Sequence, residues 1–274
     1  MMIREGWPVE KKHAFGLSTA NLKHIAIVSM TVDHIGAYMF PNLLILRILG
    51  RLAAPIFLFC MAEGLRHTRN RKKYLLRLYL AGAAISVCDR LLTFFGAPFP
   101  QFGNILFTFF YTGLYVTLLE GLFQKKPWAL PGLLATAIPT VLVNLYDMFF
   151  SPGLSRNLLT ALLPSPIHVQ YSLLFVLLGM GLYFAKTKQM QLLVYAVFCA
   201  LCILGTQLGL GNVPQPISYL LSNSIFNSTQ QYMLLALPLL ALYNGEKGKS
   251  SKQFFYAYYP LHRYAICLLA AVLQ

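Results

Sequence analysis

The chain has 274 residues, of which 57% are hydrophobic and 11% are charged, whereas soluble domains carry about 25% charged residues. This composition excludes an ordinary soluble domain and is typical of a protein that crosses a membrane several times. The net charge of +14 does not indicate nucleic acid, because the basic residues cluster in short loops between apolar segments. We therefore expect membrane lipid, and no nucleic acid, around this chain.

The polar stretch 1–21 is predicted to be a cytoplasmic leader, and residues 22–274 a single membrane-embedded domain. The first twenty residues lack the apolar core and cleavage site of a secretory signal, so the first helix is expected to act as an uncleaved one. Apolar segments suited to crossing a bilayer follow. They lie at 22–40, 43–65, 74–95, 104–123, 128–150, 168–185, 192–210, 230–243 and 254–273.

The basic residues predict how these segments are oriented. All but five of the 22 Lys and Arg residues fall in the leader or in loops on the same predicted side, which is the cytoplasmic side. The five others are Arg47, Arg51, Arg90, Arg156 and Arg263. We predict an all-α bundle of about nine transmembrane helices, with the N-terminus cytoplasmic and the C-terminus outside. The short segment 230–243 contains Pro238, which leaves eight to ten spans open.

The first two segments form a hairpin that contains four polar groups at membrane depth. Asp33 and His34 lie in the first segment, Arg47 and Arg51 in the second, and each charge costs about 2.5–3.5 kcal/mol on insertion scales. At 1.5 Å per residue, Asp33, His34 and Arg51 share a layer about 12 Å from the outer face. Adjacent residues on a helix point apart, so Asp33 is predicted to pair with Arg51 rather than with His34.

Two interpretations of these groups stay open. In the functional one, His34 is a general base, and intramembrane charges favour this interpretation. In the structural one, the ion pair only holds the hairpin together. The same duality applies to His262, which either takes part in the reaction or bonds a backbone carbonyl freed by Pro260. Asn104 is a further site candidate, or simply a helix cap.

A second group of candidates lies at the predicted cytoplasmic side. Lys23 precedes His34 by three helical turns, about 16 Å, and is either functional or an ordinary flanking lysine. The loop after the second segment could bind a polyanionic cofactor such as a nucleotide, or only anionic lipid. Its candidate cations are Arg66, Arg69, Arg71 and Lys72. Cys199 and Cys202 have metal-ligand spacing, but they lie in an apolar segment and are predicted to pack there, so no metal site is expected.

Five blocks of sequence resemble one known family. They are Leu22-Lys-x-Ile-Ala-x-x-x-Met-x-x-Asp33-His34, Leu46-Arg47-x-x-Gly50-Arg51-x-Ala-x-Pro55-Ile-Phe, Glu63-Gly64-x-x-x-Thr68-Arg-Asn-x-x-x-Tyr74-x-x-Arg77-Leu, Asn104-x-x-Phe107-Thr108 and Phe255-Tyr-x-Tyr-Tyr-Pro260-x-His262. In this order they resemble TraX proteins, a family associated with N-terminal acetylation of conjugative pilin. TraX is in turn similar to a superfamily of membrane acyltransferases that includes heparan glucosaminide acetyltransferase. The middle of the chain, 118–243, contributes little to the resemblance.

The resemblance implies a multi-pass acetyltransferase of the bacterial cytoplasmic (inner) membrane. Acetyl-CoA would be the co-substrate from the cytoplasm. The acceptor would be an amine or hydroxyl on a peptide N-terminus, an amino sugar or another small molecule, reached from the outer side. His34 would be the base, acting by direct transfer or through an acyl-histidine.

The resemblance also suggests roles for the other candidates. Arg47 and Arg51 would position Asp33 or polarise the thioester carbonyl, with His262 and Asn104 as secondary site residues. Contacts to the CoA phosphates would come from Lys23, Arg66, Arg69, Arg71 and Lys72. The alternatives are a proton-coupled transporter or channel, and a non-catalytic component of a conjugation or secretion apparatus. No particular oligomeric state is predicted.

Overall fold

The computed structural model describes residues 16–96, 104–151, 153–210, 225–226, 228–249 and 252–273. In these parts the regular elements are helices. An isolated β-bridge also pairs Leu17 with Tyr243. The all-α prediction is confirmed for the described chain. The helices are α1 (Thr19–Tyr38), α2 (Leu44–Gly50), α3 (Ala53–Arg66), α4 (Arg71–Phe94), α5 (Ile105–Phe123), α6 (Ala129–Ala135), α7 (Ile138–Phe149), α8 (Leu154–Leu162), α9 (Ser172–Phe184), α10 (Lys188–Gln207), the 3-10 helix η2 (Gln230–Ala236), α12 (Leu237–Ala241) and α13 (Lys252–Leu273).

Several of these helices suit a membrane. Four helical stretches among the described residues are long and apolar enough to cross a bilayer, namely Leu44–Arg66, Ile105–Phe123, Ala129–Phe149 and Lys188–Gln207. The stretches Ser172–Phe184 and Gln230–Ala241 are apolar but shorter. The chain therefore has the helices of a membrane protein, while nine spans and the placement of the termini stay predictions.

Prolines divide helices that the sequence suggested were continuous. The predicted segment 43–65 consists of α2 and α3, which are separated at Arg51 and Leu52. Pro55 causes the break, because its ring clashes with the carbonyl four residues earlier, on Arg51. Pro139 explains the gap between α6 and α7 in the same way. A further difference is α8, which lies between the predicted segments 128–150 and 168–185.

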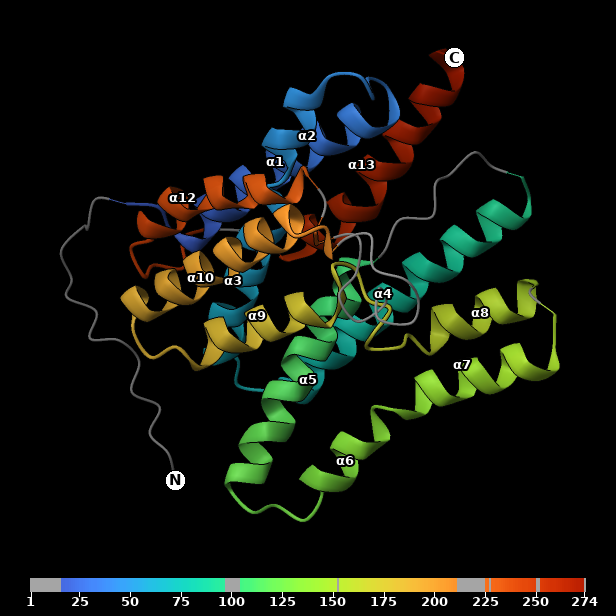
Figure 1. Cartoon of the computed structure of the whole chain (residues 1–274), viewed down its shortest axis with the longest axis horizontal. Helices are drawn as coiled ribbons and strands as arrows, with labels where there is room; N and C mark the ends of the chain where they lie inside the picture. The colour runs from blue at the N-terminus through green and yellow to red at the C-terminus, as the bar shows by residue number, and fades with distance from the viewer. Residues whose placement is uncertain are drawn as a thin grey trace.

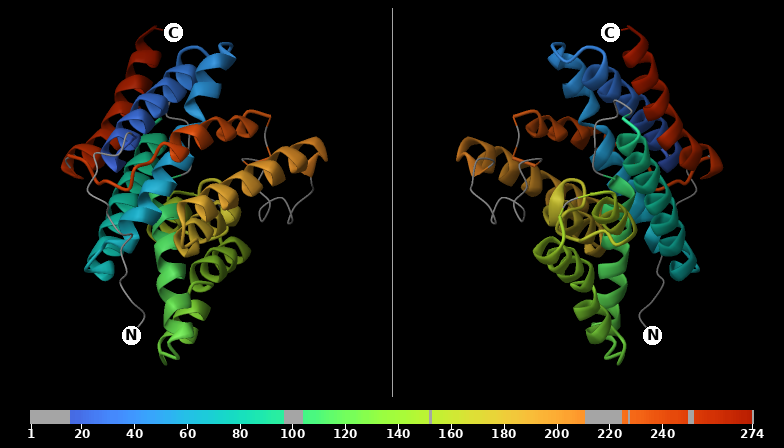
Figure 2. Two further views of the ribbon diagram at one scale, coloured as in Figure 1. Left: turned by 90° about the vertical axis from the view of Figure 1, so that its left-hand side faces the viewer. Right: turned by 90° about the vertical axis from the view of Figure 1, so that its right-hand side faces the viewer.

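The helix α1 lies at the centre of the packing around the hairpin. It packs against α2, α3 and α13, and Figure 1 shows α1, α2 and α13 side by side. On the other side of α3, α5 packs against α4 and α9. The helices α6 and α7 project away from this core, as both views of Figure 2 show. Large apolar side chains on α7 are exposed, including Leu145 and Met148, as expected for a surface that faces lipid.

The segments that we predicted to be cytoplasmic meet at one end of the bundle, which we call the basic end. The amide of Thr19 donates to the Glu246 carbonyl over 2.8 Å. Arg66 Nη2 donates to the Ala185 carbonyl over 2.6 Å, and Lys188 Nζ donates to the Tyr243 carbonyl over 2.7 Å. The start of α1, the end of α3, the α9–α10 connection and the chain after α12 are therefore neighbours, as one shared membrane face requires.

Candidate functional site

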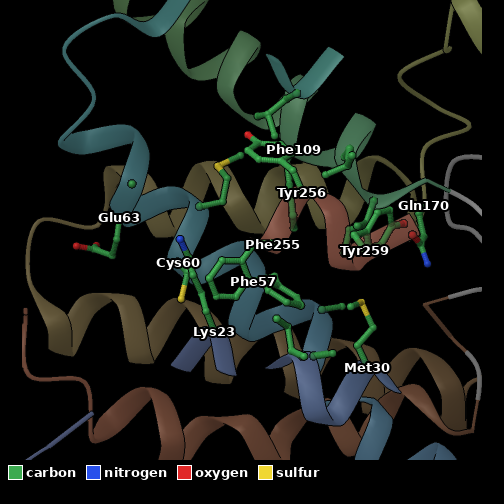
Figure 3. A pocket seen from close by; sticks show the side chains of 18 of the residues that line it. Lys23, Met30, Phe57, Cys60, Glu63, Phe109, Gln170, Phe255, Tyr256 and Tyr259 are labelled. Carbon is green, nitrogen blue, oxygen red and sulfur yellow. The ribbon is translucent and has the colours of Figure 1, made fainter. Parts of the chain in front are cut away.

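A cavity of about 1490 Å³ runs from the basic end to the charged layer of the hairpin. Its walls come from α1, α2, α3, α4, α5 and α13, with residues from the segment before α9, the start of η2 and the segment after α12. In Figure 3, Lys23, Cys60 and Glu63 lie toward one end of this cavity, whereas Tyr259 and Gln170 lie together toward the other. The charged and histidine residues that line it are Lys23, Asp33, His34, Arg47, Arg51, Glu63, His67, Arg69, Lys73, Arg77, His168, Lys247 and Arg263.

Asp33 is the centre of the polar layer in the hairpin. Its Oδ1 accepts from Arg51 Nη2 at 2.5 Å and lies 3.0 Å from Arg47 Nη1. The predicted pairing of Asp33 with Arg51 is therefore present, and Arg47 joins it. Arg51 is only 6% exposed, so this charge depends on its carboxylate partner. Two guanidinium groups share one carboxylate, which leaves one positive charge in excess beside His34.

His34 is hydrogen-bonded to His262 of α13, with 2.7 Å between its Nδ1 and Nε2 of His262. The other nitrogen of His262, Nδ1, lies 2.7 Å from the carbonyl oxygen of Tyr258. A carbonyl can only accept a hydrogen bond, so a neutral His262 donates from Nδ1 and accepts at Nε2. His34 must then donate from Nδ1, which makes its Nε2 the basic nitrogen. The Tyr258 carbonyl thus sets the tautomer of both rings.

Two further contacts order this region, one within α13 and one between α13 and α1. The Tyr258 ring stacks on His262 with 4.9 Å between centroids and an interplanar angle of 7°. The hydroxyls of Tyr258 and Thr31 are 2.8 Å apart. His262 therefore bonds a backbone carbonyl, that of Tyr258 rather than the one freed by Pro260, and it also bonds His34, which lines the cavity. The hydrogen bond to His34 was not foreseen, because the two residues are 228 positions apart.

The five predicted phosphate-binding cations are not brought together. Lys23 and Arg69 line the cavity, whereas Arg66, Arg71 and Lys72 are not among the described residues that line it. Arg66 donates to Glu63 Oε1 over 2.8 Å and to the carbonyls of Leu182, Tyr183 and Ala185 at the end of α9. These contacts satisfy carbonyls that a helix end leaves without partners.

Arg71 and Asn104 also make contacts of a structural kind. Arg71 pairs with Glu120 and with the Tyr183 hydroxyl, which joins α4 to α5 and α9. Asn104 caps α5 by accepting from the Leu106 amide over 3.0 Å, and its Nδ2 donates to the Gly82 carbonyl over 2.7 Å. The cap interpretation of Asn104 is confirmed, and its side chain connects α5 to α4. The cavity lining includes its neighbours Ile105 and Leu106 instead.

Arg263 lines the cavity, although we did not include it among the site candidates from sequence. It is 3% exposed, and its Nη2 donates to Asp89 Oδ1. The sequence did contain a signal, because Arg263 follows His262 directly and is one of five arginines outside the predicted cytoplasmic segments. An arginine inside an apolar helix indicates function by default.

Comparison with known proteins gives a consistent result over nearly the whole chain. A family model described as "TraX protein" matches residues 18–270. The probable fimbrial assembly protein FimC, serogroup H1, of Dichelobacter nodosus is 26% identical over 272 residues, which cover 94% of this chain and 97% of that protein. An uncharacterised protein of Rickettsia prowazekii (strain Madrid E) is 34% identical over 97 residues, or 35% of each chain. No solved structure matches.

Proposed function

The chain belongs to the TraX family, and from that premise we propose that it is an acetyl-CoA-dependent acetyltransferase of the bacterial inner membrane. The observation that supports this most directly is the His34–His262–Tyr258 carbonyl chain at the edge of a large cavity. A histidine with a fixed tautomer beside excess positive charge suits transfer of an acyl group to an amine or hydroxyl. The same site supports the proposed relationship of this chain to membrane acyltransferases.

In the proposed reaction, His34 Nε2 removes a proton from the acceptor nitrogen or oxygen. That atom bonds to the acetyl carbon, and the carbonyl electron pair moves onto oxygen. When the carbonyl re-forms, the carbon–sulfur bond breaks and CoA leaves as a thiolate, which takes the proton from His34. Asp33 is committed to Arg47 and Arg51, so it balances charge in the layer while His262 orients the base.

The donor is proposed to enter at the basic end. The cations that line the cavity there are Lys23, Arg69, Lys73, Arg77 and Lys247, and they suit the phosphates of CoA. Lys23 Nζ lies 5.5 Å from the Phe255 ring centroid, which fixes one of these cations at the cavity wall. The thioester then reaches the layer of His34 through the cavity. This set replaces Arg66, Arg71 and Lys72 of the original prediction.

The acceptor is proposed to arrive from the opposite end of the cavity. In this arrangement the chain has about nine spans, with the basic end cytoplasmic and the C-terminus outside. A relative named as a fimbrial assembly protein favours a peptide N-terminus as acceptor over an amino sugar. The same name supports the second candidate function, a non-catalytic component of such an assembly apparatus.

The test uses the full chain purified in detergent with acetyl-CoA and a short synthetic peptide that has a free N-terminus. We expect acetyl-CoA binding by calorimetry, and acetylation of the peptide by mass spectrometry. His34→Ala should lower the rate by about 10²–10⁴-fold, the usual contribution of a general base. His24→Ala is the matched control, because His24 lies exposed on the same helix. Absence of acetyl-CoA binding, or equal rates for both variants, would refute the enzyme and favour the assembly component.

A further inference from the structure

We propose that the side chain of Tyr258 is a positioning group, which fixes the register of α13 against α1 and thereby keeps His262 on His34. The role of His34 as base rests on the proposed function, whereas the fixed register is a property of the fold. The backbone carbonyl of Tyr258 already determines the tautomer of His262. Its hydroxyl and its ring add two further constraints.

The hydroxyl of Tyr258 donates a hydrogen bond to Thr31 of α1. The two hydroxyl oxygens are 2.8 Å apart, and the Thr31 hydroxyl donates its own proton to the Ile27 carbonyl over 2.9 Å. A hydroxyl has one proton to donate and lone pairs that accept. Thr31 must therefore accept from Tyr258, and the bond between the two helices has a defined direction.

This bond and the bond between His34 and His262 form two links between α1 and α13. On α1, Thr31 precedes His34 by three residues, and on α13, Tyr258 precedes His262 by four. Residues at these spacings lie about one turn apart on the same face of a helix. Both links therefore join the faces through which the two helices pack. A single link would allow α13 to pivot about it, whereas two links one turn apart resist both pivoting and sliding.

The ring of Tyr258 restrains the plane of the His262 ring. The two rings are stacked, with 4.9 Å between centroids and an interplanar angle of 7°. The torsion that turns an imidazole ring has a broad energy profile, so a nearly parallel neighbour limits a rotation that is otherwise easy. The bond of 2.7 Å between His34 Nδ1 and His262 Nε2 requires a fixed ring plane, which the stack supports.

The tautomer of His34 depends on this placement. If α13 shifts, Nδ1 of His34 loses its acceptor, and a neutral imidazole can then carry its proton on either nitrogen. A ring protonated at Nε2 cannot remove a proton there. Loss of the Tyr258 hydroxyl should therefore lower the fraction of His34 in the reactive form, although the base itself is unchanged.

The first experiment measures this tautomer by NMR in the detergent-purified full chain labelled with ¹⁵N-histidine, without any substrate. The signals of His34 are assigned by their absence in His34→Ala. We expect protonated Nδ1 and bare Nε2 in the wild type, and a mixture of tautomers in Tyr258→Phe, which keeps the ring and the carbonyl. Tyr264→Phe is the matched control, because it removes a hydroxyl of α13 that bonds Asp89 of α4 over 2.8 Å. An unchanged tautomer in Tyr258→Phe, or an equal change in Tyr264→Phe, overturns the proposal.

The second experiment is a double-mutant cycle on the rate of acetyl transfer to the peptide. Tyr258→Phe and Thr31→Val should each lower kcat by about 2–10-fold, the net contribution of one hydrogen bond, with KM nearly unchanged. The double variant should be no slower than either single variant, because both remove the same bond, and Thr31→Ser should recover most of the rate. Additive losses in the double variant overturn the proposal. A wild type that has the expected tautomer but transfers no acetyl group instead refutes the proposed function.

Discussion

The sharpest prediction about stability concerns Gly50, where α1 and α2 approach each other closely. A Cβ at Gly50 would lie 2.3 Å from both Cβ and Oδ1 of Asp33, whereas non-bonded carbon atoms pack at about 3.5–4.0 Å. The Cβ of Asp33 is attached to the backbone, so no rotamer change relieves the clash. The two helices must separate by about 1 Å, which lengthens the hydrogen bond between Arg51 and Asp33 from its 2.5 Å.

We therefore expect Gly50→Ala to lower the unfolding free energy by about 1–3 kcal/mol, the usual cost of overpacking. The control is Gly64→Ala, because a Cβ there would meet nothing within 4 Å. Gly64 lies in the last turn of α3, where this change should add at most about 0.5–1 kcal/mol through helix propensity. Thermal unfolding of the detergent-purified protein measures both. Equal midpoints for the two variants, or greater stability of Gly50→Ala, would refute the packing argument.

Two further predictions concern the proposed reaction. His262→Phe should lower kcat by about 10–100-fold, because a buried His34 N–H without an acceptor costs about 1–3 kcal/mol, while His262→Gln should retain more activity because its amide oxygen can accept. Equal activities would remove His262 as the orienting group. Arg69→Glu and Lys73→Glu should each weaken acetyl-CoA binding at low salt, and the difference should shrink as salt increases. Lys186→Glu, outside the cavity lining, is the control, and an equal loss there would contradict the donor site.

The fold was predictable where local chemistry determines it. Apolar length located the helices, and Ser18 caps α1 by accepting from the Asn21 amide over 3.2 Å, as its residue type suggested. The break between α2 and α3 could also have been found from sequence, since the ring of Pro55 clashes with the carbonyl of Arg51. In contrast, α8 lies in a stretch rich in Pro, Gly and Ser whose helical part depends on packing against α4.

The site was predictable only within the hairpin. The depth estimate placed Asp33 and Arg51 in one layer, and they are in contact, because counting residues along two joined helices is sufficient for that. The contact between His34 and His262 joins opposite ends of the chain, and no local rule gives that distance. The same limit applied to Arg66 and Arg71, whose charge was visible in the sequence but whose partners on α5 and α9 were not.

These contacts assign different tasks to the hairpin and to α13. A carboxylate that holds two guanidinium groups is not available to orient a histidine, so the tautomer of His34 must be set from elsewhere. The Tyr258 carbonyl does so through His262. In the proposed reaction the hairpin thus provides the base and the excess charge, while α13 orients that base. The sequence of the hairpin favoured a functional site over a structural ion pair, but it could not show the orienting group, because that group lies on α13.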